Sequence, residues 1–416
     1  MPLPLFLPCA AGVESLLADE VRRILPTADV HELRGGVALA GDPLEVMTLN
    51  LESRLAQRVL IEVAHGPYAH ENDVYTLAHD VAWTEWITPQ HTLRVDTTSQ
   101  RSPLKSLNFV ALRVKDAVCD ALRDATGERP SVDTRHPDLP LVLHLGERDA
   151  TIYVDSSGES LFKRGWREDT GDAPLKETLA AAMLAAAGWR GTPEAGGALH
   201  DPCCGSGTIA IEAAQIACGI APGLKRRFGF ERLLPFSGDA PRAELQRLRS
   251  HAQARIHPSA VPIVASDVSF RMVDFARRNA QRAGVEAAIE FHGGDALERP
   301  APLLPDALPG TLMINPPYGE RIEVGGKAAR VSAEDRDTPT DFFARLASHW
   351  KHAYTAHPAG WTAWVLSPDM KLPGAMRLKE SRRVPMWNGP LECRLFRFDL
   401  VAGSAREARP RGPTPA

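Results

Sequence analysis

The sequence lacks two features that would each define a class of protein. No hydrophobic run approaches the length of a membrane-spanning helix, and the apolar segment from Met1 to Ala11 has no basic region like that of a signal peptide. The six cysteines form no CxxC pair and no Cys/His cluster with zinc-like spacing. We therefore expect a cytoplasmic protein that holds no metal and keeps its cysteines as small buried thiols.

A strong basic charge is also missing. The formal net charge of the 416 residues is −4. Residues 1–155 hold 14 Lys and Arg against 23 Asp and Glu, a balance of −9, and the remainder of the chain carries +5. A polyanionic partner would therefore have to be held by local basic patches rather than by the overall field of the protein.

The order of the predicted elements changes in the polar, glycine-containing segment 156–173. Before it, helices and strands follow one another without strict alternation, which is typical of a compact α+β fold. We predict helices over 12–25, 43–51 and 108–125, and strands over 35–39, 58–64, 92–97, 141–145 and 150–154. The helix over 108–125 is expected to place Phe109, Leu112, Val118 and Leu122 on one side.

From Pro174 onward strands and helices alternate, which predicts a mostly parallel, doubly wound sheet. We predict helices over 175–188, 207–217, 269–283 and 341–354, and strands over 198–203, 262–266, 287–292, 311–315 and 361–366. Segments 380–387 and 391–400 flank Asn388-Gly389, a turn typical of an antiparallel hairpin.

A glycine-containing loop lies between the first strand of this series and the next helix. Its residues are Asp201, Pro202, Cys203, Cys204, Gly205, Ser206, Gly207 and Thr208. The glycines allow a tight turn and let a ligand lie against backbone N–H groups at the helix start. A dinucleotide fingerprint would need a third glycine, which is absent here, so a nicotinamide-dependent oxidoreductase is disfavoured.

Three acidic residues stand at the ends of three successive predicted strands. Asp201 could hold an amino group, Asp267 could accept hydrogen bonds from ribose hydroxyls, and Asp295 could meet an adenine amine. Each acid alone is better explained as a helix N-cap. Together they suit S-adenosylmethionine, which has a cationic amino group, a diol and an adenine.

The turn after the fourth strand of the series is Asn315-Pro316-Pro317-Tyr318. Two prolines cannot continue a strand ladder, so the chain leaves the sheet here, at the edge where ligands of such sheets bind. The Asn315 side-chain oxygen and the Pro316 carbonyl could accept hydrogen bonds from an exocyclic amine and turn its lone pair toward a methyl group. Tyr318 could stack on the base. A packed, proline-rich turn is the plain structural alternative.

These motifs, in this order, resemble the class I methyltransferases that modify amino groups of nucleic acids. Segments 12–17 and 102–105 are similar to THUMP-containing RNA methyltransferases, and 155–167 resembles the junction that follows their THUMP domain. Segments 174–177 and 388–393 complete the pattern. The nearest likeness is to the ribosomal RNA guanine-N2 methyltransferases of the RlmL type.

The resemblance implies a fold, an activity and a partner. The fold would be α/β, a Rossmann-like class I methyltransferase domain with a seven-stranded, mostly parallel sheet, preceded by an α+β THUMP/ferredoxin-like region. The implied domains are a ferredoxin-like part over 1–50, a THUMP RNA-binding domain over 51–155, a linker over 156–173, the methyltransferase domain over 174–402 and a disordered tail over 403–416.

The implied activity is methylation of one guanine N2 in 23S rRNA, free or in a precursor particle, with S-adenosylmethionine as cofactor. A second methyltransferase domain is not present in the sequence, which implies one activity rather than two. We also assign Val268 and Ala296, which follow the second and third acids, to the cofactor site. Asn315 is assigned both to catalysis and to the cofactor.

Basic residues near aromatic side chains are the candidate RNA contacts, because such pairs can grip phosphates and stack on unpaired bases. They are Arg101, Lys105, Lys163, Arg164, Arg167, Lys225, Arg226 and Arg227. The neighbouring aromatics are Trp166, Phe228 and Phe230. A solvated charged surface explains any single one of these clusters equally well.

Three other functions stay open at this stage. A tRNA guanine-N2 methyltransferase would share both kinds of domain. An adenine-N6 methyltransferase would share the Asn-Pro-Pro-Tyr turn. A catalytically silent RNA-binding assembly factor would share the fold without turnover.

Overall fold

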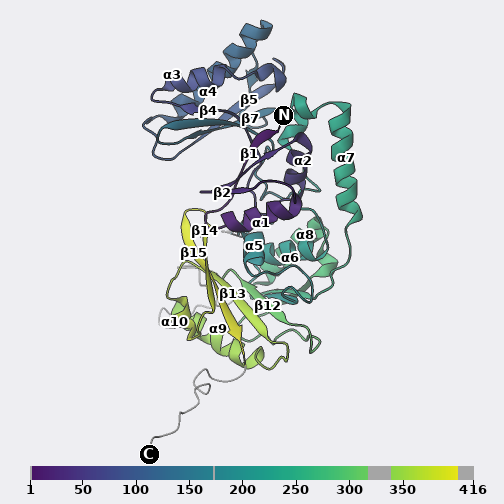
Figure 1. Ribbon diagram of the computed structural model, residues 1–416. Helices are drawn as coiled ribbons and strands as arrows, with labels where there is room; N and C mark the ends of the chain where they lie inside the picture. The colour runs from purple at the N-terminus through teal and green to yellow at the C-terminus, as the bar shows by residue number, and fades with distance from the viewer. Residues whose placement is uncertain (1, 172–173, 317–338, 402–416) are drawn as a thin grey trace, which may run out of the picture. The chain divides into compact units, whose positions relative to one another are not determined.

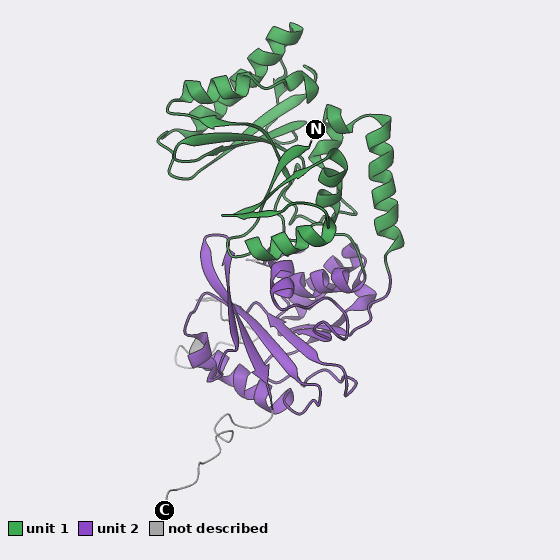
Figure 2. Cartoon of the chain, in the orientation of Figure 1, with its two compact units in different colours: residues 1–165, 219–256 green, residues 166–218, 257–416 purple. Residues whose placement is uncertain are grey.

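The computed structural model describes residues 2–171, 174–316 and 339–401. The chain forms two compact units (Figure 2). Unit 1 comprises Met1–Gly165 and Gly219–Ile256, and unit 2 comprises Trp166–Cys218 and His257–Ala416. The segment Gly219–Ile256, which we placed in a continuous domain over 174–402, therefore packs with unit 1. The predicted boundaries of the linker and the other domains remain predictions.

Unit 1 is built on an eight-stranded sheet with the strand order β2-β3-β1-β4-β8-β7-β5-β6. Its strands are β1 (Leu3–Pro8), β2 (His31–Leu33), β3 (Gly36–Gly41), β4 (Leu60–Pro67), β5 (Thr92–Ser99), β6 (Ser131–Val132), β7 (Leu139–Leu145) and β8 (Asp149–Asp155). Its helices are α1 (Glu14–Ile24), α2 (Pro43–Glu52), α3 (Glu71–His79), α4 (Leu107–Thr126) and α7 (Asp239–Ala254), with 3-10 turns at Trp83–Glu85, Gly229–Arg232 and Leu234–Phe236. β5 pairs in parallel with β6 and β7, and the other neighbours are antiparallel.

Helix α4 buries a different stripe from the one we predicted. Phe109 and Leu112 are 50% and 53% exposed, whereas Val118 and Leu122 are buried. The buried stripe begins at Val110 and continues through 114, 117 and 118, which is the spacing of one helix face. The prediction for Phe109 and Leu112 was wrong because both lie off this stripe.

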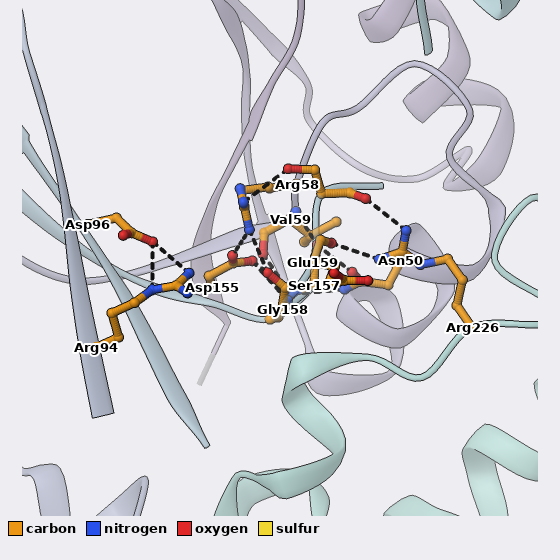
Figure 3. A network of polar contacts seen from close by, with 12 residues as sticks. Asn50, Arg58, Val59, Arg94, Asp96, Asp155, Ser157, Gly158, Glu159 and Arg226 are labelled. Carbon is orange, nitrogen blue, oxygen red and sulfur yellow. Dashed lines mark hydrogen bonds and ion pairs between the residues drawn. The ribbon is translucent and has the colours of Figure 1, made fainter. Parts of the chain in front are cut away.

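The motif that starts at Asp155 forms a buried polar network at the end of β8 (Figure 3). Arg58 forms an ion pair with Asp155 and donates to the Gly158 carbonyl at 2.7 Å. The Ser157 hydroxyl donates to Asn50 Oδ1 at 2.6 Å and accepts from the Val59 N–H. Burial raises the pKa of Asp155 to about 6, although Arg58 opposes the shift. The network joins α2, the residues directly before β4 and the end of β8 within unit 1.

Unit 2 is built on a seven-stranded sheet with the strand order β11-β10-β9-β12-β13-β15-β14. Its strands are β9 (Ala198–Asp201), β10 (Ile263–Asp267), β11 (Glu290–Gly293), β12 (Gly310–Ile314), β13 (Trp361–Ser367), β14 (Arg382–Asn388) and β15 (Leu391–Leu400). Its helices are α5 (Glu177–Ala186), α6 (Thr208–Ala217), α8 (Phe270–Ala283), α9 (Pro339–Ala353) and α10 (Leu372–Met376), with a 3-10 turn at Glu286–Ala288. β9 to β13 are parallel, and β15 runs antiparallel to both β13 and β14, as predicted.

Helices cover the sheet of unit 2 (Figure 1). α9 and α10 contribute to one hydrophobic core with β12, β13 and β15, in which Trp350, Tyr354, Phe396 and Phe398 are buried. α6 contacts β9 and β10, and α8 contacts β10 and β11. The strands β9, β10 and β12 are buried almost throughout, including the polar residues of β9, as expected for strands inside a parallel sheet.

Among the described residues, no helix has the length and apolar character needed to cross a membrane. All six cysteines are free thiols, and five of them are buried, which confirms the prediction for these residues.

Candidate active site

The carboxyl ends of the parallel strands bring the predicted motifs to one edge of the sheet of unit 2. Asp201 pairs with Ala265 across β9 and β10, and Asp267 pairs with Gly293 across β10 and β11. On the other side of β9, β12 ends at Ile314, directly before Asn315. Ligands of such sheets bind beyond this edge, so the motifs share one region of the unit.

The glycine loop turns between β9 and α6 through two left-handed residues. Gly205 has φ +52 and Gly207 has φ +89, a region that favours glycine. A Cβ on Gly207 would lie 2.9 Å from the Ala276 Cβ, so the loop packs closely against α8. A Cβ on Gly205 would meet nothing within 4 Å, which shows that the loop is open on that side.

Asp267 connects the glycine loop to β10. Its Oδ2 accepts the Gly205 N–H and its Oδ1 accepts the Ser269 N–H, both at 2.9 Å. Burial raises the pKa of the Asp267 carboxyl. A carboxylate offers about four acceptor positions, so these two hydrogen bonds leave capacity for a ligand hydroxyl.

The other two acids also hold their own turns. Asp201 is buried and accepts the Cys203 N–H at 3.2 Å, and burial together with nearby Asp267 raises its pKa well above the usual value. Asp295 accepts the Leu297 N–H at 2.9 Å. Each of the three acids therefore accepts a backbone N–H of its own turn, which is a structural role. All three also lie at the same edge of the sheet, where a ligand could reach them.

Arg167, which we predicted to contact RNA, is largely buried and is hydrogen-bonded to the glycine loop. Its guanidinium donates to Glu177 Oε1 at 2.8 Å, to Ser206 Oγ at 3.0 Å and to Thr208 Oγ1 at 2.8 Å. It also donates to the Leu175 carbonyl, and only 14% of its side chain is exposed. These contacts occupy the fork of the guanidinium, so the RNA-binding prediction for Arg167 was wrong.

Asn279 on α8 connects a second chain segment to the loop. It is fully buried, and its Nδ2 donates to the Ser206 carbonyl at 3.0 Å and to the Asp169 carbonyl at 2.9 Å. Arg282 donates to the Trp166 carbonyl at 2.9 Å and pairs with Asp169 at 2.6 Å. Residues 166–169, predicted as part of a linker, thus belong to the framework of the glycine loop.

A buried histidine supports the sheet beside the site. His200 on β9 lies with Nδ1 2.9 Å from the Tyr354 hydroxyl and Nε2 3.2 Å from the Ser266 hydroxyl. Burial lowers the pKa of His200 to about 3, so the ring is neutral at physiological pH. We did not predict a role for His200, because its partners Tyr354 and Ser266 are distant in the sequence and the segment Leu199-His200-Asp201 gives no sign of them.

Phe270, another residue that we did not predict, lies beside Asp267 at the start of α8. Its side chain is 78% exposed although the residue is a large aromatic, and Val268 is 38% exposed. A Cβ on Gly293 would lie 2.3 Å from Phe270 Cε1, so the ring is in contact with the backbone that leads to Asp295. The glycine pair Gly293-Gly294 is the signal that could have indicated this close approach.

The turn Asn315-Pro316-Pro317-Tyr318 is described only in part. Asn315 is partly exposed and Pro316 is buried. Pro317 and Tyr318 lie outside the described residues. Ala296, which follows the third acid, is buried.

The predicted RNA contacts of unit 1 divide into two groups. Arg164 donates to the carbonyls of Leu161 and Arg54, and Arg226 donates to the carbonyls of Glu159 and Ser160. Both arginines are buried, so their RNA-binding prediction was wrong. The predicted stacking aromatics Trp166, Phe228 and Phe230 are buried as well. The exposed candidates are Arg101, Lys105, Lys163, Lys225 and Arg227.

Among the described residues, no group of three or more His, Cys, Asp or Glu side chains could hold a metal ion. Burial raises the pKa of the Cys204 thiol in the glycine loop well above its usual range, which favours the protonated thiol over the nucleophilic thiolate.

Comparison with known families identifies the chain. A family model described as the RMKL-like methyltransferase domain matches residues 164–397. The chain belongs to this family. Two further models match the N-terminal part, a THUMP domain over 68–155 and an RlmL ferredoxin-like domain over 4–60. The resemblance and the fold class predicted from the sequence are both confirmed.

Similar proteins and structures agree with this assignment. Ribosomal RNA large subunit methyltransferase K/L of Syntrophotalea carbinolica is 37% identical over 96% of this chain and 54% of its own length. The protein of the same name from Saccharophagus degradans is 35% identical over 97% of this chain and 52% of its own length. The chain thus spans about half the length of the curated relatives it matches.

Solved structures match nearly the whole chain. SMU.472, crystallised in complex with SAH, has a TM-score of 0.81 and 25% identity, over 97% of this chain and 99% of its own. A possible methylase from Clostridium difficile 630 has a TM-score of 0.81 and 26% identity, over 99% of this chain and all of its own. A predicted N6-adenine-specific DNA methylase from Listeria monocytogenes has a TM-score of 0.79 and 25% identity, over 96% of both chains.

Proposed function

We propose that this protein is a cytoplasmic RNA methyltransferase that uses S-adenosylmethionine to methylate the N2 amine of a guanine in 23S ribosomal RNA. The observation that carries the proposal is the meeting of the glycine loop, Asp267, Asp295 and Asn315 at one edge of the sheet. The names of the ribosomal RNA methyltransferase relatives and the THUMP match support RNA as the substrate.

The residues at this edge fit the cofactor by their chemistry. The open side of the glycine loop and the free N–H groups at the start of α6 suit the amino-acid part, with Asp201 near its ammonium. Asp267 would accept the ribose hydroxyls and Asp295 the adenine amine. Val268, Phe270 and Ala296 would cover the adenine, and the exposed ring of Phe270 has the area to do so.

The other loop residues would bind the cofactor, and the turn Asn315-Pro316-Pro317-Tyr318, which we call the methyl-transfer turn, would bind the guanine. Pro202, Cys203, Gly205, Ser206, Gly207 and Thr208 would shape the backbone around the cofactor. When bound, the cofactor supplies an electrophilic methyl group. Asn315 and the Pro316 carbonyl would accept hydrogen bonds from the guanine amine and orient its lone pair, and Pro317 and Tyr318 would hold the base.

Adenine-N6 methylation is the second candidate, because the Listeria monocytogenes protein of similar structure carries that description. The Asn-Pro-Pro-Tyr turn suits both amines, so the site does not choose between them. The exposed Arg101, Lys105, Lys163, Lys225 and Arg227 remain the RNA contacts that we propose for unit 1.

The proposal is tested by incubating the protein with S-adenosylmethionine labelled on the methyl group and with 23S rRNA, tRNA or DNA from a strain lacking the gene. We expect incorporation into 23S rRNA and none into DNA. Incorporation into DNA alone would contradict the proposal and favour the second candidate. Cofactor binding without incorporation into any substrate would favour a silent assembly factor.

A further inference from the structure

The hairpin formed by β14 and β15 continues past the edge of the sheet where Asn315 lies. β13 ends at Ser367, which pairs with Arg394 of β15. β15 begins three residues earlier, at Leu391, which pairs with Asn388 of β14. At about 3.3 Å per residue the hairpin therefore extends roughly 10 Å beyond the end of β13. β14 and β15 lie side by side in Figure 1.

One face of this hairpin carries aromatic and guanidinium groups in alternation. Trp387 pairs with Glu392 across the strands, and Arg394 is its diagonal neighbour, with its guanidinium carbon 5.7 Å from the centre of the indole. Further along the same face, the guanidinium of Arg383 lies 5.5 Å from the ring of Phe396, which is fully buried in the core, so Trp387 is the accessible aromatic of these two. Trp387 is partly exposed, and half of the Arg383 side chain is exposed although its guanidinium pairs with Glu380 Oε1 on the surface. A phosphate would share the Arg383 guanidinium with this exposed ion pair, which contributes little by itself.

The segment around the hairpin is basic although the protein is acidic. Residues 371–397 hold seven Lys and Arg against two Glu, a formal charge of +5, whereas the whole chain carries −4. Lys371, Arg377, Lys379, Arg382 and Arg383 are exposed. Basic side chains next to partly exposed aromatics are typical of surfaces that bind single-stranded nucleic acid.

The hairpin is also close enough to the methyl-transfer turn for one RNA strand to reach both. Ile314 pairs with Val365 on β13, and Val365 pairs with Phe396 on β15. With about 4.8 Å between neighbouring strands, β15 and β14 lie roughly 10 and 14 Å from β12. A nucleotide bound at Asn315 would thus place its neighbours in the chain near Trp387.

We propose that the β14–β15 hairpin binds the unpaired RNA that adjoins the methylated nucleotide. A base stacks on Trp387, whose indole is supported by Arg394, and Arg383 contacts a phosphate. The occupant is single-stranded RNA rather than duplex, because a base must leave its stack to lie on an indole. This inference rests on the proposed function and extends it from the methylated base to its neighbours.

The first test measures binding of a short fluorescein-labelled single-stranded oligoribonucleotide of mixed sequence by anisotropy. We expect Trp387→Ala to weaken binding roughly 5- to 150-fold, the range of base–aromatic stacking, and Trp387→Phe to retain most of the affinity. Leu303→Ala is the matched control, since Leu303 is a fully exposed apolar residue in the loop between β11 and β12. All variants should bind SAH with the affinity of the wild type.

The second test separates stacking from charge. Arg383→Ser should reduce the slope of log K against log salt by about 0.7, the value for one lost phosphate contact on single strands. Arg190→Ser removes another exposed arginine of unit 2, in the segment that precedes β9, and it should leave the slope unchanged.

The outcomes distinguish this inference from the proposed function. If the wild type methylates 23S rRNA and Trp387→Ala keeps its RNA affinity and kcat/KM, the hairpin inference is overturned and the proposed function stands. Equal binding of a duplex of the same sequence by the wild type would also overturn the inference. The same holds if Trp387→Ala loses affinity for a ribosomal protein but keeps its affinity for RNA. If the wild type methylates no RNA, the proposed function fails first.

Discussion

Replacing Arg167 should destabilise unit 2, because Arg167 neutralises the buried carboxylate of Glu177. Glu177 is only 3% exposed, and Arg167 forms its ion pair at 2.8 Å. Removing one partner of a buried pair costs about 3–5 kcal/mol, because the remaining charge is left without compensation. Arg167→Ala also removes the hydrogen bonds to Ser206 and Thr208, so the glycine loop should loosen and cofactor affinity should fall.

The loss of unfolding free energy caused by Arg167→Ala should increase as the pH rises. Burial raises the pKa of Glu177, and Arg167 opposes that shift. Without Arg167 the pKa of Glu177 in the folded protein rises further above its ordinary value of 4.5. A carboxyl group with a raised folded pKa loses stability as pH increases, so the deficit of Arg167→Ala should be larger at pH 8 than at pH 5. Adding Glu177→Gln should recover part of it, because the uncompensated charge is then gone.

Urea unfolding followed by tryptophan fluorescence measures these effects, and calorimetry with SAH measures cofactor affinity. Arg190→Ala is the control, because Arg190 is an exposed arginine of the same unit. A deficit of Arg167→Ala that is no larger than that of the control would refute the reasoning. A deficit that is the same at pH 5 and pH 8 would refute the assignment of the cost to Glu177.

Three further predictions follow from the same framework. Gly207→Ala should cost roughly 2–4 kcal/mol in urea unfolding, because its φ of +89 and the nearby Ala276 oppose a Cβ. The pKa of His200 in the folded protein is about 3, so between pH 5 and pH 7 only the unfolded ring binds a proton. His200 should therefore make the wild type about 2 kcal/mol less stable at pH 5 than at pH 7. His200→Asn should remove this dependence of stability on pH. Asp267→Asn should weaken SAH binding at least about tenfold in calorimetry, as expected for losing a charged hydrogen-bond acceptor, and unchanged affinity would count against the ribose contact.

The predicted order of strands and helices in unit 2 agrees with the structure to within a few residues. Buried strands such as β12 are continuous apolar runs, and glycine or proline residues mark their ends. The helix α7 was not predicted. It buries only Leu245 and Ala252 along 16 residues, so few apolar residues in the sequence mark its buried side.

The hydrogen-bond partners of Arg164, Arg167 and Arg226 could not be predicted, for a different physical reason. Arg164 and Arg226 bind backbone carbonyls that tertiary folding brings to them, and Arg167 binds Glu177 together with two hydroxyls of the glycine loop. A buried guanidinium and a phosphate-binding guanidinium have the same local sequence. Only the positions of their acceptors distinguish them, and these positions depend on contacts that are distant in the sequence.

The most direct test of the proposed mechanism is nucleoside analysis of 23S rRNA treated with the wild type and with Asn315→Ala. We predict that the wild type produces N2-methylguanosine. The variant should produce none while its affinity for SAH stays within a small factor of the wild-type value, because Asn315 is proposed to orient the amine. N6-methyladenosine as the product would contradict the assignment of guanine. Full activity of Asn315→Ala would contradict the role of this residue in methyl transfer.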